Sequence, residues 1–120
     1  MKNKLIRGAL CLSLAMAILT PNASSAVVRD GWQKSSNQWY YYSQGLGVKN
    51  TWKKICGTWY YFDRSGKMKT GWLKDRNKWY YLDASGSYAH NGWRKIRGDW
   101  YHFKADGSMS VGWIEDHHRI

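Results

Sequence analysis

Residues 71–81 read Gly-Trp-Leu-Lys-Asp-Arg-Asn-Lys-Trp-Tyr-Tyr, and variants of this stretch recur along the chain from residue 31 onward. Its first tryptophan recurs at steps of 20, 20, 21 and 20 residues, as Trp32, Trp52, Trp72, Trp93 and Trp113. Its second recurs at steps of 20, 20 and 21 residues, as Trp39, Trp59, Trp79 and Trp100. A fixed period of this length is typical of stacked structural repeats, so the sequence predicts a core that runs along the stack.

Each repeat carries the signals of a β-hairpin, because aromatic and β-branched residues flank a pair of turn residues. The pairs are Ser36-Asn37, Cys56-Gly57, Arg76-Asn77 and Arg97-Gly98. Asn or Gly always takes the second place, as a two-residue turn with positive φ requires. With such a turn Trp52 pairs with Tyr61, and alternation along the strands places Trp52, Trp59 and Tyr61 on one face. The other face then carries Lys53, Ile55, Tyr60 and Phe62.

One hairpin alone is marginal in water, so the hairpins are expected to stack on one another. The predicted fold is an all-β solenoid of stacked β-hairpins, preceded by a helical signal peptide. The repeats form one domain at residues 27–120, with no linker or low-complexity tract inside it. Its units are 31–50, 51–70, 71–91 and 92–111, followed by a partial unit at 112–120.

Residues 1–26 have the layout of a secretory signal peptide. Lys2, Lys4 and Arg7 precede an apolar run of 11 residues, and two serines before Ala26 complete a cleavage site of small residues. A membrane anchor is the alternative, but the run is too short to cross a bilayer as a helix. The sequence therefore predicts a secreted protein with no membrane segment after cleavage and with an unpaired thiol at Cys56.

The predicted mature chain has a net charge of +8, because three of the 19 Lys and Arg residues and none of the 8 Asp and Glu residues fall in the leader. Basic residues follow the first tryptophan of every repeat, at Lys34, Lys53, Lys54, Lys74, Arg94 and Lys95. A solvated face explains this pattern, and so does attraction to an anionic polymer such as teichoic acid. Single-stranded nucleic acid also suits basic residues among aromatic ones, but a leader peptide argues against that partner.

The complete pattern is Gly-Trp, six residues, Trp-Tyr-Tyr and then Gly-x-Met-x-Thr-Gly-Trp, and the second unit carries it from Trp52 to Trp72. It resembles the choline-binding, or cell-wall-binding, repeat of surface proteins and lytic enzymes of Gram-positive bacteria and their phages, over residues 31–120. The resemblance implies that choline groups of teichoic acids bind between consecutive hairpins. Two aromatic side chains would come from one hairpin and a third from the next, with a Met or another apolar side chain beside them.

The resemblance gives a set of candidate choline-binding residues: Trp32, Trp39, Tyr41, Trp52, Trp59, Tyr61, Met68, Trp72, Trp79, Tyr81, Trp93 and Trp100. A quaternary ammonium group has no N–H to donate, so aromatic faces are suited to hold it. The junctions of the first three units fit the pattern best. The junction of the third and fourth departs from it, since Tyr88 replaces Met and His102 replaces Tyr. Trp93 and Trp100 have no complete hairpin after them, so a second chain in a homodimer would be needed to close their site.

Several functions remain open on the sequence. The first is a secreted, non-catalytic protein attached to the bacterial cell wall through choline on teichoic acid. The second is a glucan-binding repeat module, in which the same rings stack on sugars, and the third is the targeting module of a longer lytic enzyme. Buried aromatic area alone also explains repeated rings, and the middle tyrosines Tyr40, Tyr60, Tyr80 and Tyr101 are expected to pack hairpin on hairpin. The sequence shows no catalytic constellation, metal-ligand spacing or cofactor motif.

Overall fold

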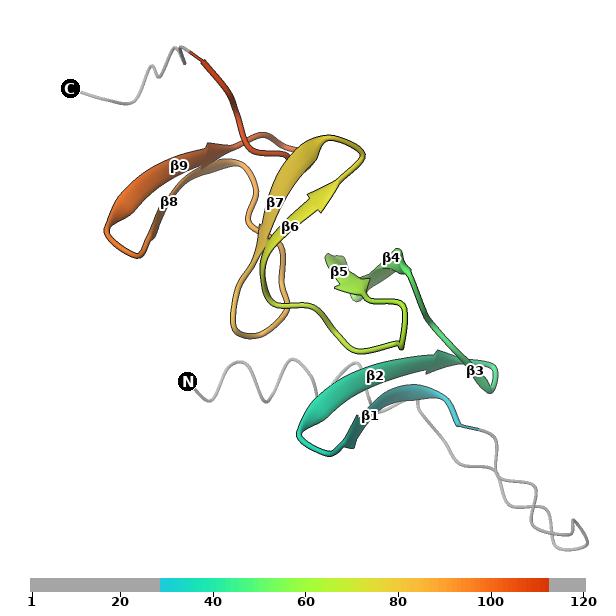
Figure 1. Ribbon diagram of the computed structural model, residues 1–120. Coiled ribbons are helices and arrows are strands. Elements are labelled where there is room, and N and C mark those ends of the chain that lie inside the picture. The colour runs from blue at the N-terminus through green and yellow to red at the C-terminus, as the bar shows by residue number, and fades with distance from the viewer. Residues whose placement is uncertain (1–28, 113–120) are drawn as a thin grey trace, which may run out of the picture. The chain divides into compact units, whose positions relative to one another are not determined.

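The computed structural model describes residues 29–112, and every regular element in this range is a β-strand (Figure 1). The strands are β1 (Gly31–Ser35), β2 (Gln38–Ser43), β3 (Leu46–Gly47), β4 (Thr51–Ile55), β5 (Thr58–Phe62), β6 (Gly71–Asp75), β7 (Lys78–Leu82), β8 (Gly92–Ile96) and β9 (Asp99–Phe103). Antiparallel hairpins form from β1–β2, β4–β5, β6–β7 and β8–β9, and β3 pairs with β2. The predicted all-β hairpin fold is confirmed. The predicted helical signal peptide at 1–26 and most of the partial unit, residues 113–120, lie outside the described residues.

Each hairpin closes through its predicted pair of turn residues. In β4–β5, Ile55 lies opposite Thr58 and Trp52 lies opposite Tyr61, as the two-residue turn predicts. Both turn residues have positive φ, 50° at Cys56 and 84° at Gly57. Two such angles in succession give the type I′ turn, whose twist matches that of the flanking strands. The turns of the other hairpins also have positive φ at both positions, Ser36-Asn37, Arg76-Asn77 and Arg97-Gly98.

Cys56, the first residue of the β4–β5 turn, is disulfide-bonded. The expectation of an unpaired thiol at this position is therefore wrong. Disulfide formation depends on the distance and direction between two Cβ atoms in space, and the position of a cysteine along the chain does not specify either.

The chain divides into two compact units between Lys69 and Thr70. The core of the first unit is formed by Phe62, which is fully buried, together with Ile55 and Tyr60. Around them pack Trp32, Tyr41, Val48 and Met68. This core connects the β1–β2 hairpin to the β4–β5 hairpin, so the two hairpins stack through their aromatic side chains.

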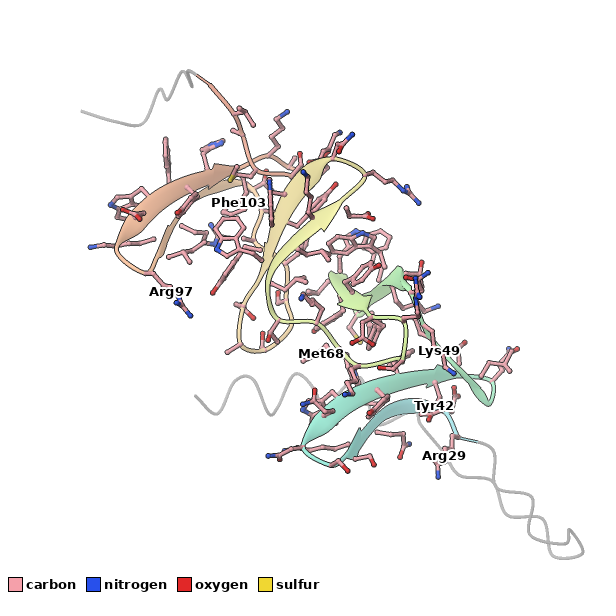
Figure 2. All side chains as sticks on the ribbon, in the orientation of Figure 1. Arg29, Tyr42, Lys49, Met68, Arg97 and Phe103 are labelled. Atoms are coloured by element: carbon pink, nitrogen blue, oxygen red, sulfur yellow. The ribbon has the colours of Figure 1, made fainter. Side chains whose placement is uncertain are left out.

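The second unit has a core of the same kind between β6–β7 and β8–β9. Phe103 is fully buried there, together with Ala89 and Ile96 (Figure 2). Around them pack Trp72, Tyr81, Tyr101 and Met109. Each unit thus consists of two hairpins that share one aromatic core, and buried aromatic area replaces the single large core that so short a chain lacks.

The turns after β5, β7 and β9 are built around an aspartate. Asp63 Oδ1 accepts hydrogen bonds from the backbone N–H groups of Ser65 and Lys67, both at 2.9 Å, and from the Ser65 hydroxyl at 2.8 Å. Asp83 makes the corresponding set of hydrogen bonds after β7. Asp106 accepts hydrogen bonds from the N–H and hydroxyl of Ser108. Local side-chain acceptors of this kind fix a turn that has no strand partner.

Hydrogen bonding lowers the pKa of two of these carboxyl groups. Burial raises the pKa of Asp63, but the hydrogen bonds from Lys67 and Ser65 and the charge of Lys67 outweigh burial, so the net pKa is lowered. At Asp106 the hydrogen bonds from Ser108 are the largest cause of a lowered pKa. Donors aimed at a carboxylate favour its charged form, so both turns are most stable when the aspartate is ionised.

A glycine in the turn after β9 makes room for an aromatic ring. Gly107 has a φ of 91°, and a Cβ atom at this position would lie 2.5 Å from Cδ2 of Tyr88. Gly66 holds the same place in the first unit, where a Cβ atom would lie 3.4 Å from the ring of Tyr40. Glycine is needed at Gly107 for two reasons, because the backbone is left-handed and because the ring leaves no space for a side chain.

Candidate functional site

One face of each hairpin carries a fixed set of side chains. The register of β1–β2 pairs Trp32 with Tyr41 and Lys34 with Trp39, so these four residues project from the same face. The same register in β6–β7 gives Trp72, Lys74, Trp79 and Tyr81. The opposite face of the following hairpin carries Tyr60 in the first unit and Tyr101 in the second unit. Within each unit, rings from two consecutive hairpins therefore meet.

The first aromatic site, defined as Trp32, Trp39, Tyr60 and Met68, lies in the first unit. The ring centre of Trp32 lies 5.9 Å from that of Trp39 and 5.0 Å from that of Tyr60, with interplanar angles of 88° and 77°. Edge-to-face arrangements of this kind are favoured by the charge distribution of aromatic rings. Phe62 also contacts Trp32, with ring centres 5.7 Å apart, but it is fully buried and belongs to the core alone. Tyr60 is 7% exposed, so it belongs to both the core and the site.

The backbone brings Met68 to this site. The Met68 N–H donates a 2.8 Å hydrogen bond to the carbonyl oxygen of Trp39, and Met68 forms an antiparallel bridge with Phe62. Its side chain packs against the buried cluster of the first unit (Figure 2). The segment after the second hairpin thus connects directly to the second tryptophan of the first hairpin and adds an apolar, flexible side chain beside the rings.

The second aromatic site, defined as Trp72, Trp79, Tyr101 and Met109, repeats this geometry in the second unit. The ring centre of Trp72 lies 6.2 Å from that of Trp79 and 4.9 Å from that of Tyr101, with interplanar angles of 84° and 68°. The Met109 N–H donates a 2.7 Å hydrogen bond to the carbonyl oxygen of Trp79. The third and fourth hairpins, despite their departures from the sequence pattern, therefore have the same ring arrangement as the first and second.

The two tryptophans of each site have different surroundings. Trp32 and Trp72 are half-buried and each contacts four other rings. Trp79 keeps 41% of its surface exposed, and Trp39 is half-buried. An accessible ring beside perpendicular neighbours offers the electron-rich faces that attract a cation. The arrangement suits a cationic group that makes no hydrogen bonds.

Tyr41 and Tyr81 lie beside these sites, on the same hairpin as the tryptophans. Their ring centres lie 5.3 Å from Trp32 and 5.1 Å from Trp72, respectively. Burial, and after it the negative charge of Asp30, raises the pKa of Tyr41, so this tyrosine is neutral at ordinary pH. The two tyrosines support the inner tryptophans, whereas the ring from the following hairpin is Tyr60 or Tyr101.

The remaining predicted residues lie on the second and fourth hairpins. Trp52 and Tyr61 contact each other with ring centres 5.3 Å apart, and Trp59 is 36% exposed. These three residues belong to the first unit and Trp72 to the second, so a site at the junction of the second and third repeats stays a prediction.

On the last hairpin, Trp93 and Trp100 are 40% and 61% exposed. His102 takes the place that tyrosine has in the other hairpins, with its ring centre 5.0 Å from that of Trp93. Its Nδ1 atom lies 2.9 Å from the hydroxyl oxygen of Ser110. The histidine thus preserves the ring contact of the repeat while it adds a polar group.

Tyr60 and Tyr101 are the site residues that sequence analysis assigned to packing alone. Their contact with the preceding hairpin confirms that they pack hairpin on hairpin, and it also makes them the third ring of each site. The signal for this role is present in the sequence. Alternation puts Tyr60 on the face opposite Trp59, so in a stack it must face the preceding hairpin, whose rings are Trp32 and Trp39.

A lysine ammonium group lies over the second tryptophan in three hairpins. The distance from Nζ to the ring centre is 5.6 Å for Lys34 and Trp39, 5.8 Å for Lys74 and Trp79, and 5.9 Å for Lys95 and Trp100. Each of these pairs is directly opposite in the hairpin register. The distances are within the range of cation–π contacts.

Metal-ligating clusters and membrane-spanning helices are both absent from residues 29–112. No group of three His, Cys, Asp or Glu side chains in this range is arranged to hold a metal ion. This part of the chain also contains no helix of the length and apolarity that crossing a bilayer requires.

Two family profiles match the chain. A profile for the choline-binding repeat matches residues 48–93, and one for a cell wall binding repeat matches residues 30–44 and 91–109. The choline binding domain of Spr1274 in Streptococcus pneumoniae is 36% identical to this chain, with a TM-score of 0.50. The match covers 53% of this chain and 97% of that structure. The chain belongs to the choline-binding repeat family.

Two longer solved structures are also similar to this choline-binding repeat protein. Choline binding protein F from Streptococcus pneumoniae is 40% identical over 79% of this chain and 32% of that one, with a TM-score of 0.68. The multimodular pneumococcal cell wall endolysin from phage Cp-1, complexed with choline, is 35% identical over 82% of this chain and 30% of that one, with a TM-score of 0.65. The chain therefore spans about a third of the length of these proteins. No curated protein matches it.

Proposed function

We propose that this choline-binding repeat protein is a secreted, non-catalytic protein that attaches to the bacterial cell wall by holding choline groups of teichoic acid in its two aromatic sites. The observation that carries the proposal is the meeting of two tryptophans of one hairpin with a tyrosine of the next. Ring centres in these sites lie between 4.9 and 6.2 Å apart, and the arrangement occurs once in each unit. The choline complex of the similar phage endolysin supports choline as the ligand.

The chemistry of choline explains why such a site would be aromatic. A trimethylammonium group is positively charged and has no N–H, so carboxylates and carbonyl groups cannot anchor it through hydrogen bonds. Aromatic faces attract it electrostatically, at about 0.5–2 kcal/mol for each ring. The Met68 and Met109 side chains lie beside the rings, where they offer apolar contact to the methyl groups. Each site is weak alone, and a polymer that carries many choline groups would bind several sites of one molecule.

The charge of the protein agrees with an anionic polymer as partner. The predicted mature chain carries a net charge of +8, from 16 Lys and Arg residues and 8 Asp and Glu residues. Basic residues at the first strand of every hairpin raise the local concentration of a polyanion and speed its association. Teichoic acid combines negatively charged phosphates with choline, and so it matches both the rings and the charge. Sugar recognition is the alternative, and titration with glucan oligomers tests it.

The test is a titration of the full chain with choline, followed by tryptophan fluorescence. The double variant W39A/W79A removes the outer ring of each aromatic site and is expected to lower choline affinity roughly tenfold or more. The matched control is W100A, which removes an even more exposed tryptophan of the last hairpin. It is expected to leave the affinity of the two sites within about twofold. Equal effects of both variants, or binding of glucan oligomers in place of choline, would contradict the proposal.

A further inference from the structure

The connector between β7 and β8, residues 83–91, differs from the rest of the repeat. The third repeat has 21 residues where the first, second and fourth have 20, and its connector carries two aromatic side chains, Tyr88 and His90. Their rings are stacked face to face, with ring centres 4.2 Å apart and an interplanar angle of 8°. The connector of the first unit, residues 44–50, contains no aromatic residue and no histidine. The stack is therefore specific to the second unit.

This connector is built into the second unit. The ring of Tyr88 lies against the turn after β9, where a Cβ atom at Gly107 would be only 2.5 Å from it. Ala89 is 7% exposed and belongs to the buried cluster against which Trp72 and Tyr101 pack. Trp72 and Tyr101 are residues of the second aromatic site, so a change in the connector reaches that site through a shared core.

The surroundings of the His90 imidazole favour its neutral form. Its Nδ1 atom is buried and makes no hydrogen bond to any residue in 29–112. A positive charge is held beside it, because Nη2 of Arg94, on β8, donates a 3.0 Å hydrogen bond to the His90 carbonyl oxygen. Burial, and after it the charge of Arg94, lowers the pKa of His90 from its ordinary value of 6.5.

Protonation of His90 would make both ring nitrogens donors, including the buried Nδ1. A buried donor without an acceptor keeps the full cost of its desolvation. The face of the Tyr88 ring attracts an imidazolium, but this attraction is weaker than the combined cost of an unpaired buried donor and the like charge of Arg94. Since the pKa of His90 is lower in the folded state, the stability that this residue contributes is complete above about pH 6.5 and is lost as the pH falls through the folded-state value.

The other histidine among residues 29–112 has different surroundings. His102 lies on β9, and its Nδ1 atom is 2.9 Å from the hydroxyl oxygen of Ser110, so it has a hydrogen-bond partner. The first unit contains no histidine at all. A response to mild acid that starts from a buried imidazole is therefore expected in the second unit and at His90.

We propose that His90 is an acid-sensitive switch of the second unit, and that protonation of its imidazole loosens the connector and weakens the second aromatic site while the first is unaffected. The stack on Tyr88 and the shared core carry the effect from the imidazole to the site. The effect on ligand binding rests on the proposed function of the two sites, whereas the loosening of the connector is independent of it.

Nuclear magnetic resonance of the full chain between about pH 8 and pH 5 follows the switch directly. The imidazole signal that disappears in H90F belongs to His90 and is expected to titrate below pH 6.5. The Ala89 N–H donates a 2.8 Å hydrogen bond to the Tyr81 carbonyl oxygen, and its protection factor against exchange should fall about threefold or more over this range. The Val48 N–H, which donates an equal bond to Tyr41 in the first unit, is the internal control and should keep its protection factor.

Three variants separate the imidazole from the rest of the connector. H90F keeps a ring for Tyr88 to stack on and takes up no proton, so the protection of its Ala89 N–H should not depend on pH. H90N lacks the ring and also takes up no proton, so it should show the same independence at a lower overall stability. H102Y restores the tyrosine of the other repeats at the second histidine and should keep the wild-type response.

Choline titrations at two pH values test the effect on the sites. Of the two aromatic sites, W39A leaves the second intact and W79A leaves the first. Between about pH 7.5 and pH 5.5 the choline affinity of W39A should fall about threefold or more, and that of W79A should change by less than about twofold. The double variant W39A/H90F should bind choline equally well at both pH values.

Three results would overturn the inference. In the first, His90 titrates at or above pH 6.5. In the second, the N–H groups of Ala89 and Val48 lose protection equally. In the third, H90F and H90N respond to acid as the wild-type protein does. Equal loss of choline affinity in W39A and W79A would refute the coupling to the second site. Failure of the proposed function looks different, since choline would then bind at neither pH while the titration and exchange results stayed as expected.

Discussion

At the scale of single residues, the inner and outer tryptophans of a repeat have different tasks. Trp32 contacts Trp39, Tyr41, Tyr60 and Phe62, so it joins two strands of its own hairpin to the core of the next. Trp39 contacts one of these rings, that of Trp32, and the Lys34 ammonium group lies over its own ring. The inner ring therefore contributes mainly to stability, and the outer ring is available mainly for a ligand.

Replacement of Trp32 by alanine tests this division. The variant is expected to lower the free energy of unfolding by about 2–4 kcal/mol, because a large aromatic side chain leaves a cavity among its neighbours. W39A, the matched change at the outer position, should cost less than about half as much. Urea unfolding monitored by circular dichroism measures both. If W39A proves as destabilising as W32A, the two rings do not differ in the way described.

The aspartates of the turns make the fold sensitive to acid. The pKa of Asp63 and that of Asp106 are both lowered from the ordinary value of 3.8. A carboxyl group with a lower pKa in the folded state stabilises the protein when it is ionised, above the unfolded-state value, and this stability is lost as the pH falls through the folded value. D63N/D106N keeps an oxygen acceptor but has no charge to lose.

We therefore expect the wild-type melting temperature to fall more steeply than that of D63N/D106N between about pH 5 and pH 2. At neutral pH the wild-type protein should be the more stable of the two. D99N, at an exposed position of β9, removes a charge without removing these turn contacts and should follow the wild-type curve. Parallel curves for wild type and D63N/D106N would show that the turn carboxylates do not set the acid sensitivity.

The sequence predicted most residues of the two aromatic sites, but it did not predict which tyrosine the following hairpin contributes to each site. Alternation along the strands correctly placed Trp32, Trp39 and Tyr41 on one face. The choice between Tyr60 and Tyr61 as the ring supplied by the next hairpin depends on which faces of two hairpins meet, and a repeat pattern within one hairpin does not determine that. The lysine contact with Trp39 is a consequence of the predicted register, although charge patterning alone does not distinguish Lys34 from a solvated lysine.

At the scale of elements, each hairpin is completed by the turn that follows it. The ring of Tyr88 lies where a side chain at Gly107 would be, and Gly66 has the corresponding relation to Tyr40. The glycine allows an aromatic side chain of one segment to lie directly on the backbone of another. This close approach, in addition to the shared core, fixes the turn after the second hairpin of each unit.

The variant G107A should therefore be more destabilising than an ordinary glycine substitution at positive φ. G98A is the matched control, because Gly98 has a φ of 90° and a Cβ atom there would have no neighbour within 4 Å. We expect G98A to cost about 1–2 kcal/mol for the left-handed backbone. G107A should cost at least about 1 kcal/mol more, because of overpacking against the ring. Urea denaturation gives both values.

The steric part of this prediction has its own check. Y88A removes the ring that a Cβ atom at Gly107 would meet, so the double variant Y88A/G107A should cost less than the sum of the two single changes. Strict additivity would show that the ring is not what excludes a side chain at Gly107. The backbone cost, which G98A also carries, should remain in the double variant.

At the scale of the whole molecule, two copies of a weak site would let the protein hold a polymer by multivalent binding. W39A alone disables the first aromatic site and leaves the second, which lies in the other unit. Calorimetric titration with free choline should then show one fewer bound ligand at nearly unchanged affinity for the rest. Retention on a surface that presents many choline groups should fall much more, by roughly tenfold or beyond, because multivalent binding is lost. A fall of only about twofold would indicate that the sites act singly.

The overall architecture was largely predictable because it follows from the period. Tryptophans at steps of about 20 residues, each pair separated by an Asn or Gly turn, specify both the hairpins and their register. The division into two compact units between Lys69 and Thr70 was not predictable, since the repeat runs through this point without interruption. The disulfide at Cys56 was not predictable either, because it depends on distances that the repeat does not encode.

The hydrogen bonds from Met68 to Trp39 and from Met109 to Trp79 make each aromatic site depend on a segment that follows it in the chain. A hairpin supplies its own tryptophans, but the backbone group that ties down the outer one belongs to a segment synthesised later. The first aromatic site is therefore complete only when residue 68 is present, and the second only when residue 109 is present. Because synthesis runs from the amino terminus, the residues of the first aromatic site are all available before those of the second.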